Sequence, residues 1–433
     1  MSTPTKKVAF HTLGCKLNFS ETSTISREFI NHGFEKVKYS GFADLYVINT
    51  CSVTENADKE ARKLIRQAKR RNPSSAIAII GCYAQLKPES IAKINGVDLV
   101  LGAEEKFNLI KYLDKIDLNK TSATIVQSEI SQTKEFMPSY SFGERTRSYL
   151  KVQDGCDYTC SFCTIPQARG ASRSDSVKKT KEIALQISKT DIREIVLTGV
   201  NIGDFGKDKS ENFLDLITDL DTLKDIDRIR ISSIEPNLLT NEIIQFCHNS
   251  NKFTPHFHIP LQSGSNKILK LMRRRYFTEL YKERIEFIKS INPDTCIGVD
   301  VIVGFPGEEE EDFLKTYEFI NSLNISYLHV FTYSERPNTD ALKINRVVPK
   351  EERSKRSKML HILSDKKKRS FYEGFMGDTR PVLFESYKNE KLIGHSDNYI
   401  KVEVNGPKEL INTIRSVKLI KNQGGSAQGI ICK

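Results

Sequence analysis

The sequence predicts an α/β protein with three structural parts: an open parallel α/β sheet domain at the N-terminus, a central partial (β/α)6 TIM-like barrel, and a small C-terminal β-barrel. Strand patterns alternate with helical patterns to about residue 113, and the alternation restarts with longer units from about residue 141. Helical patterns stop after about residue 374, where short strands and polar turns follow. A length of 433 residues fits about three domains of ~150 residues each.

The N-terminal part contains four strand patterns with helical patterns between them. Ser20 caps and Gly33 stops the first helix, and Pro73 ends the second. Strands and helices that alternate in this way are typical of a parallel sheet with covering helices. The expected strands cover 6–14, 43–51, 75–82 and 96–102, and the expected helices cover 20–33, 55–73 and 103–113.

Three cysteines lie at the ends of three of these strands. Cys15, Cys51 and Cys82 each follow a strand pattern, and ligands bind at the edge formed by the carboxyl ends of parallel strands. Buried free cysteines that pack as small apolar side chains are the alternative. Because structural zinc takes four protein ligands, three thiolates favour an iron–sulfur cluster with one iron open to another ligand.

The middle of the chain contains six further strand patterns with helical patterns between them. This repetition predicts a barrel or partial barrel, and such folds place their chemistry on the loops after the strands. The expected strands cover 148–153, 192–199, 228–234, 256–262, 296–305 and 327–333, and the helical patterns include 175–189, 211–222 and 308–323.

The loop after the first of these strands is rich in cysteine. Its sequence, VQDGCDYTCSFCTIPQARG, covers residues 152–170 and places Cys156, Cys160 and Cys163 in a C-x3-C-x2-C spacing. This spacing is too tight for a disulfide network and lacks the fourth ligand of a zinc ribbon. A chance cluster or an incomplete zinc site is the alternative.

The composition favours a cytoplasmic protein and is compatible with a polyanionic partner. The start, MSTPTKKVAFHTLGC, shows no secretory signal, and no apolar run approaches the ~20 residues that cross a bilayer. Nine cysteines in a reducing compartment indicate metal binding or catalysis where they cluster. Cys247, Cys296 and Cys432 do not cluster, and we expect them to be structural. The net charge of +11 is compatible equally with a polyanionic partner and with a generally solvated surface.

A basic segment precedes the C-terminal strands. Residues 349–374 show a helical pattern that includes Lys366, Lys367, Lys368 and Arg369. A short all-β tail beside such a helix favours RNA docking over a purely structural role. The strands expected in the tail cover 380–387, 392–404 and 416–422.

The cysteine loop resembles the cluster-binding loop of the radical S-adenosylmethionine (SAM) enzymes, and nearly the whole chain resembles the methylthiotransferase family among them. The resemblance implies that Cys156, Cys160 and Cys163 hold a [4Fe–4S] cluster whose fourth iron binds SAM. It also implies that the three strand-end cysteines hold a second, auxiliary [4Fe–4S] cluster. The matching stretches, in family order, are TLGCKLN, INTCSVTENAD, IIGCYAQ, GCDYTCSFCTIPQARG, HIPLQSGSNKILKLMRRRY and DVIVGFPGE.

The resemblance further implies SAM contacts on the loops after the strands. The stretch LTGVNIG stands where the family receives the SAM amino group, but it lacks the usual Gly-Gly-Glu form. Taken singly, each candidate is at least as often a turn, a strand end or an exposed loop residue. The candidate SAM-binding residues are Phe162, Thr198, Gly199, Ser233, Glu235, Gly304 and Arg173, with Gly307 and Arg169 as further candidates.

The residues around the first cysteine narrow the resemblance to one branch. The stretch GCKLN is similar to the enzymes that act on N6-threonylcarbamoyladenosine at position 37 of tRNA, with Leu17 in place of a more frequent Val. Enzymes for the isopentenyl form typically have Gly-Cys-Gln-Met-Asn there, and those for a ribosomal-protein aspartate have Gly-Cys-Pro-Lys-Asn. Arg273, Arg274 and Arg275 are candidates for binding the carboxylate of the threonylcarbamoyl group.

The resemblance also implies a domain organisation and partners. The expected partners are the anticodon stem-loop of tRNA and an electron-donor protein, and neither a membrane nor DNA is expected. The expected domains are 1–118 with the auxiliary cluster, a linker at 119–140, the radical SAM barrel with its basic helix at 141–372, and a TRAM-like RNA-binding domain at 373–433.

The activity implied by the resemblance is a transferase reaction with two SAM-dependent steps. One SAM methylates a sulfur on the auxiliary cluster, and a second gives a 5′-deoxyadenosyl radical that takes hydrogen from C2 of the adenine before the methylthio group is taken up. No catalytic residue beyond the cluster ligands is expected, because the cofactors carry the difficult chemistry. The alternatives are methylthiolation of a ribosomal-protein aspartate or of N6-isopentenyladenosine in tRNA and, outside enzymes, an iron–sulfur redox-sensing RNA-binding protein.

Overall fold

The computed structural model describes residues 5–51, 55–116, 123–143 and 146–432. These residues form two compact units. The first unit comprises residues 1–142, 149–159 and 163–175, and the second comprises 143–148, 160–162 and 176–433. The predicted boundary at 118 lies outside the described residues, and the four-part division made from the sequence stays a prediction.

The first unit is built on a six-stranded parallel sheet. The strand order is β2-β1-β3-β4-β5-β6, and every neighbouring pair is parallel. The four strands expected from the sequence are present, and the sequence pattern missed the short strands β2 and β6. The bounds are β1 (Lys7–Thr12), β2 (Glu35–Val37), β3 (Leu45–Thr50), β4 (Ala76–Gly81), β5 (Leu99–Leu101) and β6 (Thr124–Val126).

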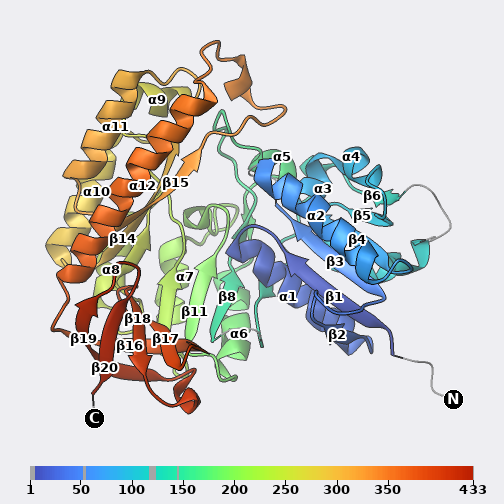
Figure 1. Ribbon diagram of the computed structural model, residues 1–433, viewed down its shortest axis with the longest axis horizontal. Helices are drawn as coiled ribbons and strands as arrows, with labels where there is room; N and C mark the ends of the chain where they lie inside the picture. The colour runs from blue at the N-terminus through green and yellow to red at the C-terminus, as the bar shows by residue number, and fades with distance from the viewer. Residues whose placement is uncertain (1–4, 52–54, 117–122, 144–145, 433) are drawn as a thin grey trace. The chain divides into compact units, whose positions relative to one another are not determined.

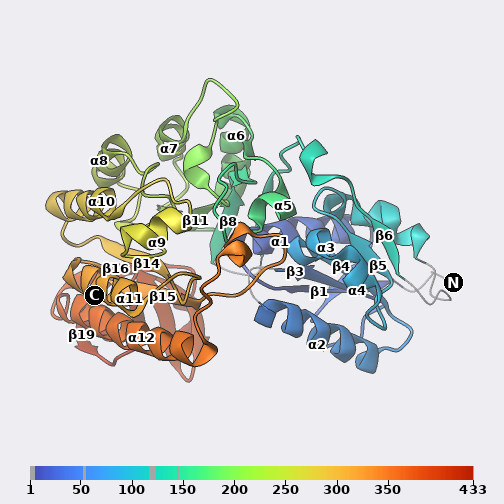
Figure 2. The same ribbon diagram turned by 90° about the horizontal axis from the view of Figure 1, so that it is seen from above.

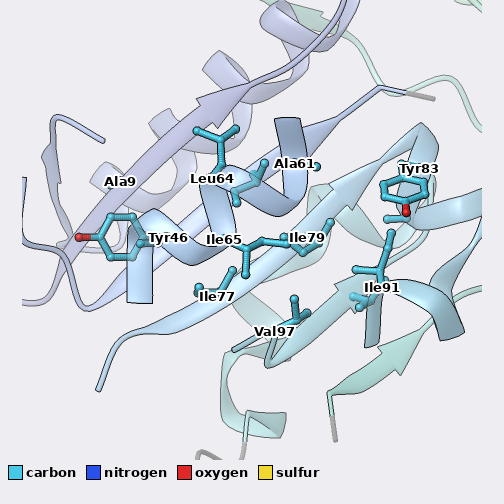
Figure 3. Packing of buried hydrophobic residues seen from close by; sticks show 14 of the residues in the cluster. Ala9, Tyr46, Ala61, Leu64, Ile65, Ile77, Ile79, Tyr83, Ile91 and Val97 are labelled. Atoms are coloured by element: carbon cyan, nitrogen blue, oxygen red, sulfur yellow. The ribbon is translucent and has the colours of Figure 1, made fainter. Parts of the chain in front are cut away.

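Helices cover both faces of this sheet, as Figure 2 shows for α1 (Lys16–Asn31) and α2 (Glu55–Arg71). On one face Leu64 and Ile65 of α2 pack against Ile79 of β4 (Figure 3). On the other face Phe29 of α1 packs with apolar residues of β1, β3 and β4. Burying such a side chain contributes roughly 1.5–3 kcal/mol, so each helix is fixed by its apolar face. The shorter helices are α3 (Cys82–Leu86), α4 (Pro88–Ala92), η1 (Glu105–Lys115) and η2 (Ile130–Gln132).

The first unit also contains most of the cysteine loop. Antiparallel pairing of β9 with β10 joins Asp154 to Arg173 at the base of the loop, and the Cys156 amide donates to the carbonyl of Gly170 at 3.0 Å. Gly155 has φ +70°, and a Cβ there would lie 1.9 Å from the Ala171 carbonyl oxygen, so only glycine fits this turn. The elements are β7 (Ser139–Tyr140), β8 (Arg147–Lys151), whose last three residues belong to this unit, β9 (Gln153–Asp154), α5 (Ile165–Arg169) and β10 (Arg173–Ser174).

The second unit begins with parallel strands that form part of a barrel. Strand β11 (Glu194–Thr198) pairs with β12 (Arg228–Ile231), and β13 (His256–His258), β14 (Cys296–Val303) and β15 (Tyr327–Thr332) form a second parallel group. Single bridges such as Ser233 to His258 connect the two groups. The predicted partial barrel is therefore confirmed. Its helices are α6 (Val177–Ser188), η3 (Ile202–Asp204), α7 (Phe213–Asp221), α8 (Asn241–Asn249), α9 (Asn266–Leu271), α10 (Thr278–Ile291), α11 (Glu310–Ser322) and η4 (Asp340–Lys343).

The basic helix and a closed β-barrel complete the second unit. Helix α12 (Lys350–Glu373) runs alongside β15 (Figure 1), where Ser364 Oγ accepts a hydrogen bond from the Leu328 amide at 2.9 Å. The predicted all-β tail is a five-stranded barrel with the order β16-β17-β18-β20-β19. None of the helices in the described part of the chain is long and apolar enough to span a membrane. The strands are β16 (Thr379–Lys388), β17 (Lys391–Ser396), β18 (Lys401–Asn405), β19 (Ile414–Asn422) and β20 (Ala427–Ile431), with η5 (Lys408–Leu410) between β18 and β19.

Candidate functional site

The three strand-end cysteines of the first unit lie at one edge of its sheet. Cys15 follows β1 and precedes α1, Cys51 follows β3, and Cys82 follows β4 as the first residue of α3. Because β1, β3 and β4 are neighbours and parallel, their carboxyl ends meet. A Cβ on Gly14, whose φ is +97°, would lie 2.7 Å from Cys51 Cβ and 3.0 Å from its Sγ. Burial raises the pKa of Cys15, and the charge of Cys82 adds to that rise.

The cysteine loop presents its thiols among backbone amides. In the first unit, the Tyr158 amide donates to Cys156 Sγ at 3.4 Å and the Ile165 amide donates to Cys163 Sγ at 3.5 Å. Such donors stabilise a thiolate and help to set the potential of a bound cluster. Within the described residues, none of these six cysteines forms a disulfide. Each set provides three thiols and no fourth cysteine. Three thiolates can hold a four-iron cluster and leave its fourth iron open to another ligand.

In the second unit, the remaining thiol of the loop, Cys160, accepts a hydrogen bond from a buried arginine. Arg274 donates through Nη1 to Cys160 Sγ at 3.2 Å, and its Nη2 makes a short ion pair with Glu235. Arg274 Nε donates to the Tyr276 hydroxyl at 3.2 Å, which in turn donates to the Pro260 carbonyl. Burial raises the pKa of Cys160, and the charge and hydrogen bond of Arg274 oppose that rise. Arg274 therefore stabilises the thiolate that a metal would bind.

Most of the candidate SAM-binding residues lie at the carboxyl ends of barrel strands. Thr198 ends β11, and Ser233 follows β12 and bridges to His258. Gly304 follows β14 with φ +73°, and its amide donates to Glu308 at 2.9 Å. The remaining candidates of the second unit are Gly199 after β11, Glu235 in its ion pair with Arg274, Gly307 after β14, and Phe162, whose ring packs edge-to-face on Phe305 with centroids 6.2 Å apart. Their contacts with SAM stay predictions.

The two loop arginines of the first unit are bonded to protein groups. Arg173 donates to the carbonyls of Glu135 at 2.9 Å and Arg169 at 2.6 Å. It also pairs with Asp154 at 3.3 Å. Arg169 donates to Asp154 at 2.9 Å and, at 3.1 Å, to Glu21. Their predicted role at the SAM carboxylate has no support from these contacts and stays a prediction.

One polar group was missed by the sequence reasoning. His258 Nε2 lies 2.8 Å and His329 Nδ1 lies 3.3 Å from Asp300 Oδ1, on three adjacent parallel strands. Asp300 and His329 are partners in register, and His258 pairs with Gly298, two residues before Asp300. Burial alone would raise the pKa of Asp300, but the two histidines hold it well below its usual value. The available signal was an ionisable side chain within each of three otherwise largely apolar strands.

Two family models match the chain. Residues 7–102 match the model described as "Uncharacterized protein family UPF0004", and residues 150–320 match the radical SAM superfamily. The matched ranges contain Cys15, Cys51 and Cys82 in the first case and the C-x3-C-x2-C loop in the second.

Curated relatives match nearly the whole chain. The Threonylcarbamoyladenosine tRNA methylthiotransferase MtaB of Aquifex aeolicus is 41% identical over 94% of this chain and 99% of its own length. The protein of the same name from Bacillus subtilis is 40% identical over 96% and 94%. A tRNA-2-methylthio-N(6)-dimethylallyladenosine synthase of Endomicrobium trichonymphae is 32% identical over 92% and 94%.

Solved structures share the fold. The radical S-adenosylmethionine methyltransferase TsrM of Kitasatospora setae, with tryptophan and a SAM analogue bound, has a TM-score of 0.58 at 14% identity. It covers 76% of this chain and 73% of its own. At this level of identity the likeness concerns the fold.

Proposed function

This chain belongs to the family of radical SAM tRNA methylthiotransferases, and from that membership we propose that it methylthiolates C2 of N6-threonylcarbamoyladenosine at position 37 of tRNA. Membership of the radical SAM superfamily implies SAM and a [4Fe–4S] cluster as cofactors. The observation that carries the proposal is the near-complete match to relatives that bear this activity in their names, together with the GCKLN stretch at Cys15.

Two clusters are proposed, one for each set of three cysteines. Cys156, Cys160 and Cys163 would hold the cluster that binds SAM, and Cys15, Cys51 and Cys82 would hold the auxiliary cluster. The backbone amides that donate to the sulfurs of Cys156 and Cys163 support the first assignment. The convergence of strand ends β1, β3 and β4 supports the second. When bound, the clusters and SAM supply the radical and the methylthio group, and the protein supplies order and exclusion of water.

The residues of the chain have positioning tasks in this proposal. The Arg274 guanidinium, only 4% exposed, would hold Cys160 as a thiolate and fix its direction. Gly199, which follows β11, would let a nucleoside approach the backbone, whereas the side of Gly304 that a Cβ would occupy is taken by the Arg353 side chain.

The tRNA anticodon stem-loop is the proposed macromolecular partner, with an electron-donor protein as reductant. Single-stranded loops present bases that proteins bind without opening a duplex. The closed C-terminal barrel next to the basic helix α12 supports RNA docking in the second unit. Not every lysine of this helix is available for phosphate, because Lys367 Nζ donates to the carbonyls of Asn321 and Leu323 at 2.7 and 2.6 Å.

Two cysteine variants test the proposal in anaerobically reconstituted full-length protein. Wild type is expected to bind roughly eight irons, from two four-iron clusters. Cys160→Ala is expected to abolish formation of 5′-deoxyadenosine from SAM, whereas Cys51→Ala is expected to retain it and to lose methylthio transfer. Cys247→Ala, a cysteine outside both sets, is the matched control and is expected to keep both reactions. A Cys51→Ala protein that still transfers the methylthio group would overturn the auxiliary cluster.

A further inference from the structure

A buried network of charged side chains lies in the first unit between the cysteine loop and the auxiliary cysteines. Its members come from α1, η1, β8, β9, α5 and β10, and none of their side chains is more than 10% exposed. The members are Glu21, Lys106, Lys151, Asp154, Arg169 and Arg173.

Two carboxylates organise the network. Glu21 accepts from Lys106 Nζ at 2.7 Å, from Lys151 Nζ at 3.1 Å and from both terminal nitrogens of Arg169. Asp154 accepts from Arg169 at 2.9 Å and from Lys151 and Arg173, each at 3.3 Å. Every carboxylate is thus shared among several cations.

The network has an excess of positive charge. Four cationic side chains face two carboxylates, which leaves two positive charges uncompensated among the groups bonded in this network. Burial opposes ionisation, but the cations keep the pKa of Glu21 and of Asp154 well below their usual values. Burial also lowers the pKa of Lys106 despite the nearby Glu21. Burying a charge without a partner costs several kcal/mol of folding free energy. We therefore expect an anion to bind beside this network.

The Arg169 guanidinium places part of this positive charge near the auxiliary cysteines. Its Nη2 donates to Asn18 Oδ1 at 2.5 Å. Asn18 Nδ2 donates to the carbonyls of Leu13 at 2.9 Å and Thr50 at 3.1 Å, which are the strand ends that lead into Cys15 and Cys51. Helix α3, which begins with Cys82, packs against α5, which ends with Arg169. Cys82, Glu21 and Asp154 raise the pKa of Arg169 well above its usual value, although burial alone would lower it.

We propose that this buried network is the counter-charge of the auxiliary cluster, with Arg169 as its positioning residue. The inference rests on the proposed function, because it needs a cluster at Cys15, Cys51 and Cys82. A [4Fe–4S] cluster with three thiolates carries a net charge of roughly −1 when oxidised and −2 when reduced, and net charge is one of the factors that set its potential. The excess of two positive charges matches the reduced form.

Arg169 belongs to the cysteine loop and is also bonded to Asn18, which lies near the auxiliary cysteines, so it links the two cysteine sets. Arg169 ends α5, which begins two residues after Cys163, so it belongs to the same loop as the cysteines proposed to bind the SAM cluster. A shift of α5 would move the Arg169 guanidinium and with it the positive charge beside Asn18. The network is therefore expected to set the reduction potential of the auxiliary cluster, without contacting substrate.

The test uses the full chain with Cys156, Cys160 and Cys163 replaced by Ala, so that only the auxiliary cluster is loaded. Iron content and the reduction midpoint, from a potentiometric titration followed by EPR, are measured for this background and for added Arg169→Met, Arg169→Lys and Glu21→Gln substitutions. Arg169→Met is expected to lower the midpoint by about 59 mV or more, which is the one-electron equivalent of a tenfold change. Arg169→Lys is expected to recover part of that change, and Glu21→Gln is expected to raise the midpoint.

The opposite signs separate electrostatics from damage to the fold. A network with a merely structural role would shift both charge variants in the same direction, or neither, and that result would overturn the counter-charge inference while the proposed function stands. A background protein that binds no iron after reconstitution would instead overturn the auxiliary cluster, and with it the proposed route of sulfur transfer. About four irons in the background together with shifts of opposite sign would support both.

Discussion

Glu194→Gln is expected to destabilise the second unit by removing the partner of a buried arginine. Glu194 begins β11, and its side chain is 2% exposed, while that of Arg230 on β12 is 1% exposed. Arg230 donates through Nε at 2.9 Å and through Nη2 at 3.4 Å to the two oxygens of Glu194. Its Nη2 also donates to the Asp397 carbonyl at 3.3 Å, and its guanidinium lies 4.8 Å from the Tyr399 ring centroid. The pair thus joins the parallel strands to the C-terminal barrel.

The magnitude follows from the ionisation of Glu194. Burial opposes the charged form, but Arg230 and Arg147 lower the pKa of Glu194 from 4.5 to about 2. That difference corresponds to about 3 kcal/mol of folding free energy at neutral pH. Because the pKa is lower in the folded protein, this stabilisation is fully present above pH ~4.5 and is lost as the pH falls towards ~2. Removing one partner of a buried pair costs a similar amount, about 3–5 kcal/mol.

Urea unfolding of cluster-free protein, followed by circular dichroism at pH 7, 4 and 3, measures this effect. The variant is expected to lose about 3 kcal/mol at pH 7, and the difference from wild type is expected to shrink as the pH falls. Glu286→Gln, in an exposed pair with Lys282 at 3.7 Å, is the control and is expected to change stability by less than about 1 kcal/mol. A Glu194→Gln protein as stable as this control at pH 7 would refute the reasoning.

Three further substitutions follow from the same contacts. Gly14→Ala places a methyl group 2.7 Å from Cys51 Cβ, at a residue whose φ is +97°. The reconstituted variant is expected to lose the auxiliary irons, about half of the total, and to keep 5′-deoxyadenosine formation. Full iron content would contradict this. Arg274→Met removes the 3.2 Å hydrogen bond to Cys160 and is expected to slow 5′-deoxyadenosine formation at least tenfold. Arg274→Lys is expected to recover part of the rate. An unchanged rate in Arg274→Met would argue against a role of Arg274 at the thiolate. Asp300→Asn weakens the acceptor shared by His258 and His329 and is expected to cost about 1.5–3 kcal/mol of unfolding free energy without changing iron content; loss of iron would place this group at a cluster.

The repeating parts of the fold could be predicted from the sequence because each follows from a local pattern. The strand ends at Cys15, Cys51 and Cys82 follow from alternation along the chain, and parallel pairing then brings them to one edge. The segment 103–113 was predicted as an ordinary helix, but it overlaps the 3-10 helix η1 (Glu105–Lys115), where Asn108 departs from helical geometry. The spacing of apolar residues in this segment does not distinguish a 3-10 helix from an α-helix.

The contacts between distant segments could not be predicted. Arg169 was a candidate for the SAM carboxylate because it lies near the end of the cysteine loop, but its partners Asn18 and Glu21 lie 151 and 148 residues earlier in the chain. Likewise Asp300 and His329 come together only through the register of β14 with β15. Contacts between residues so far apart depend on the folded structure. In the sequence they are visible only as polar residues within apolar segments.

The most direct test of the central claim is mass spectrometry of nucleosides from tRNA incubated anaerobically with reconstituted protein, SAM and a reductant. Two tRNA substrates are compared, one with N6-threonylcarbamoyladenosine and one with N6-isopentenyladenosine at position 37. The claim predicts the 2-methylthio product on the first substrate, with loss of the C2 hydrogen, and none on the second. Product only on the isopentenyl substrate, or on neither while both clusters are loaded, would contradict it.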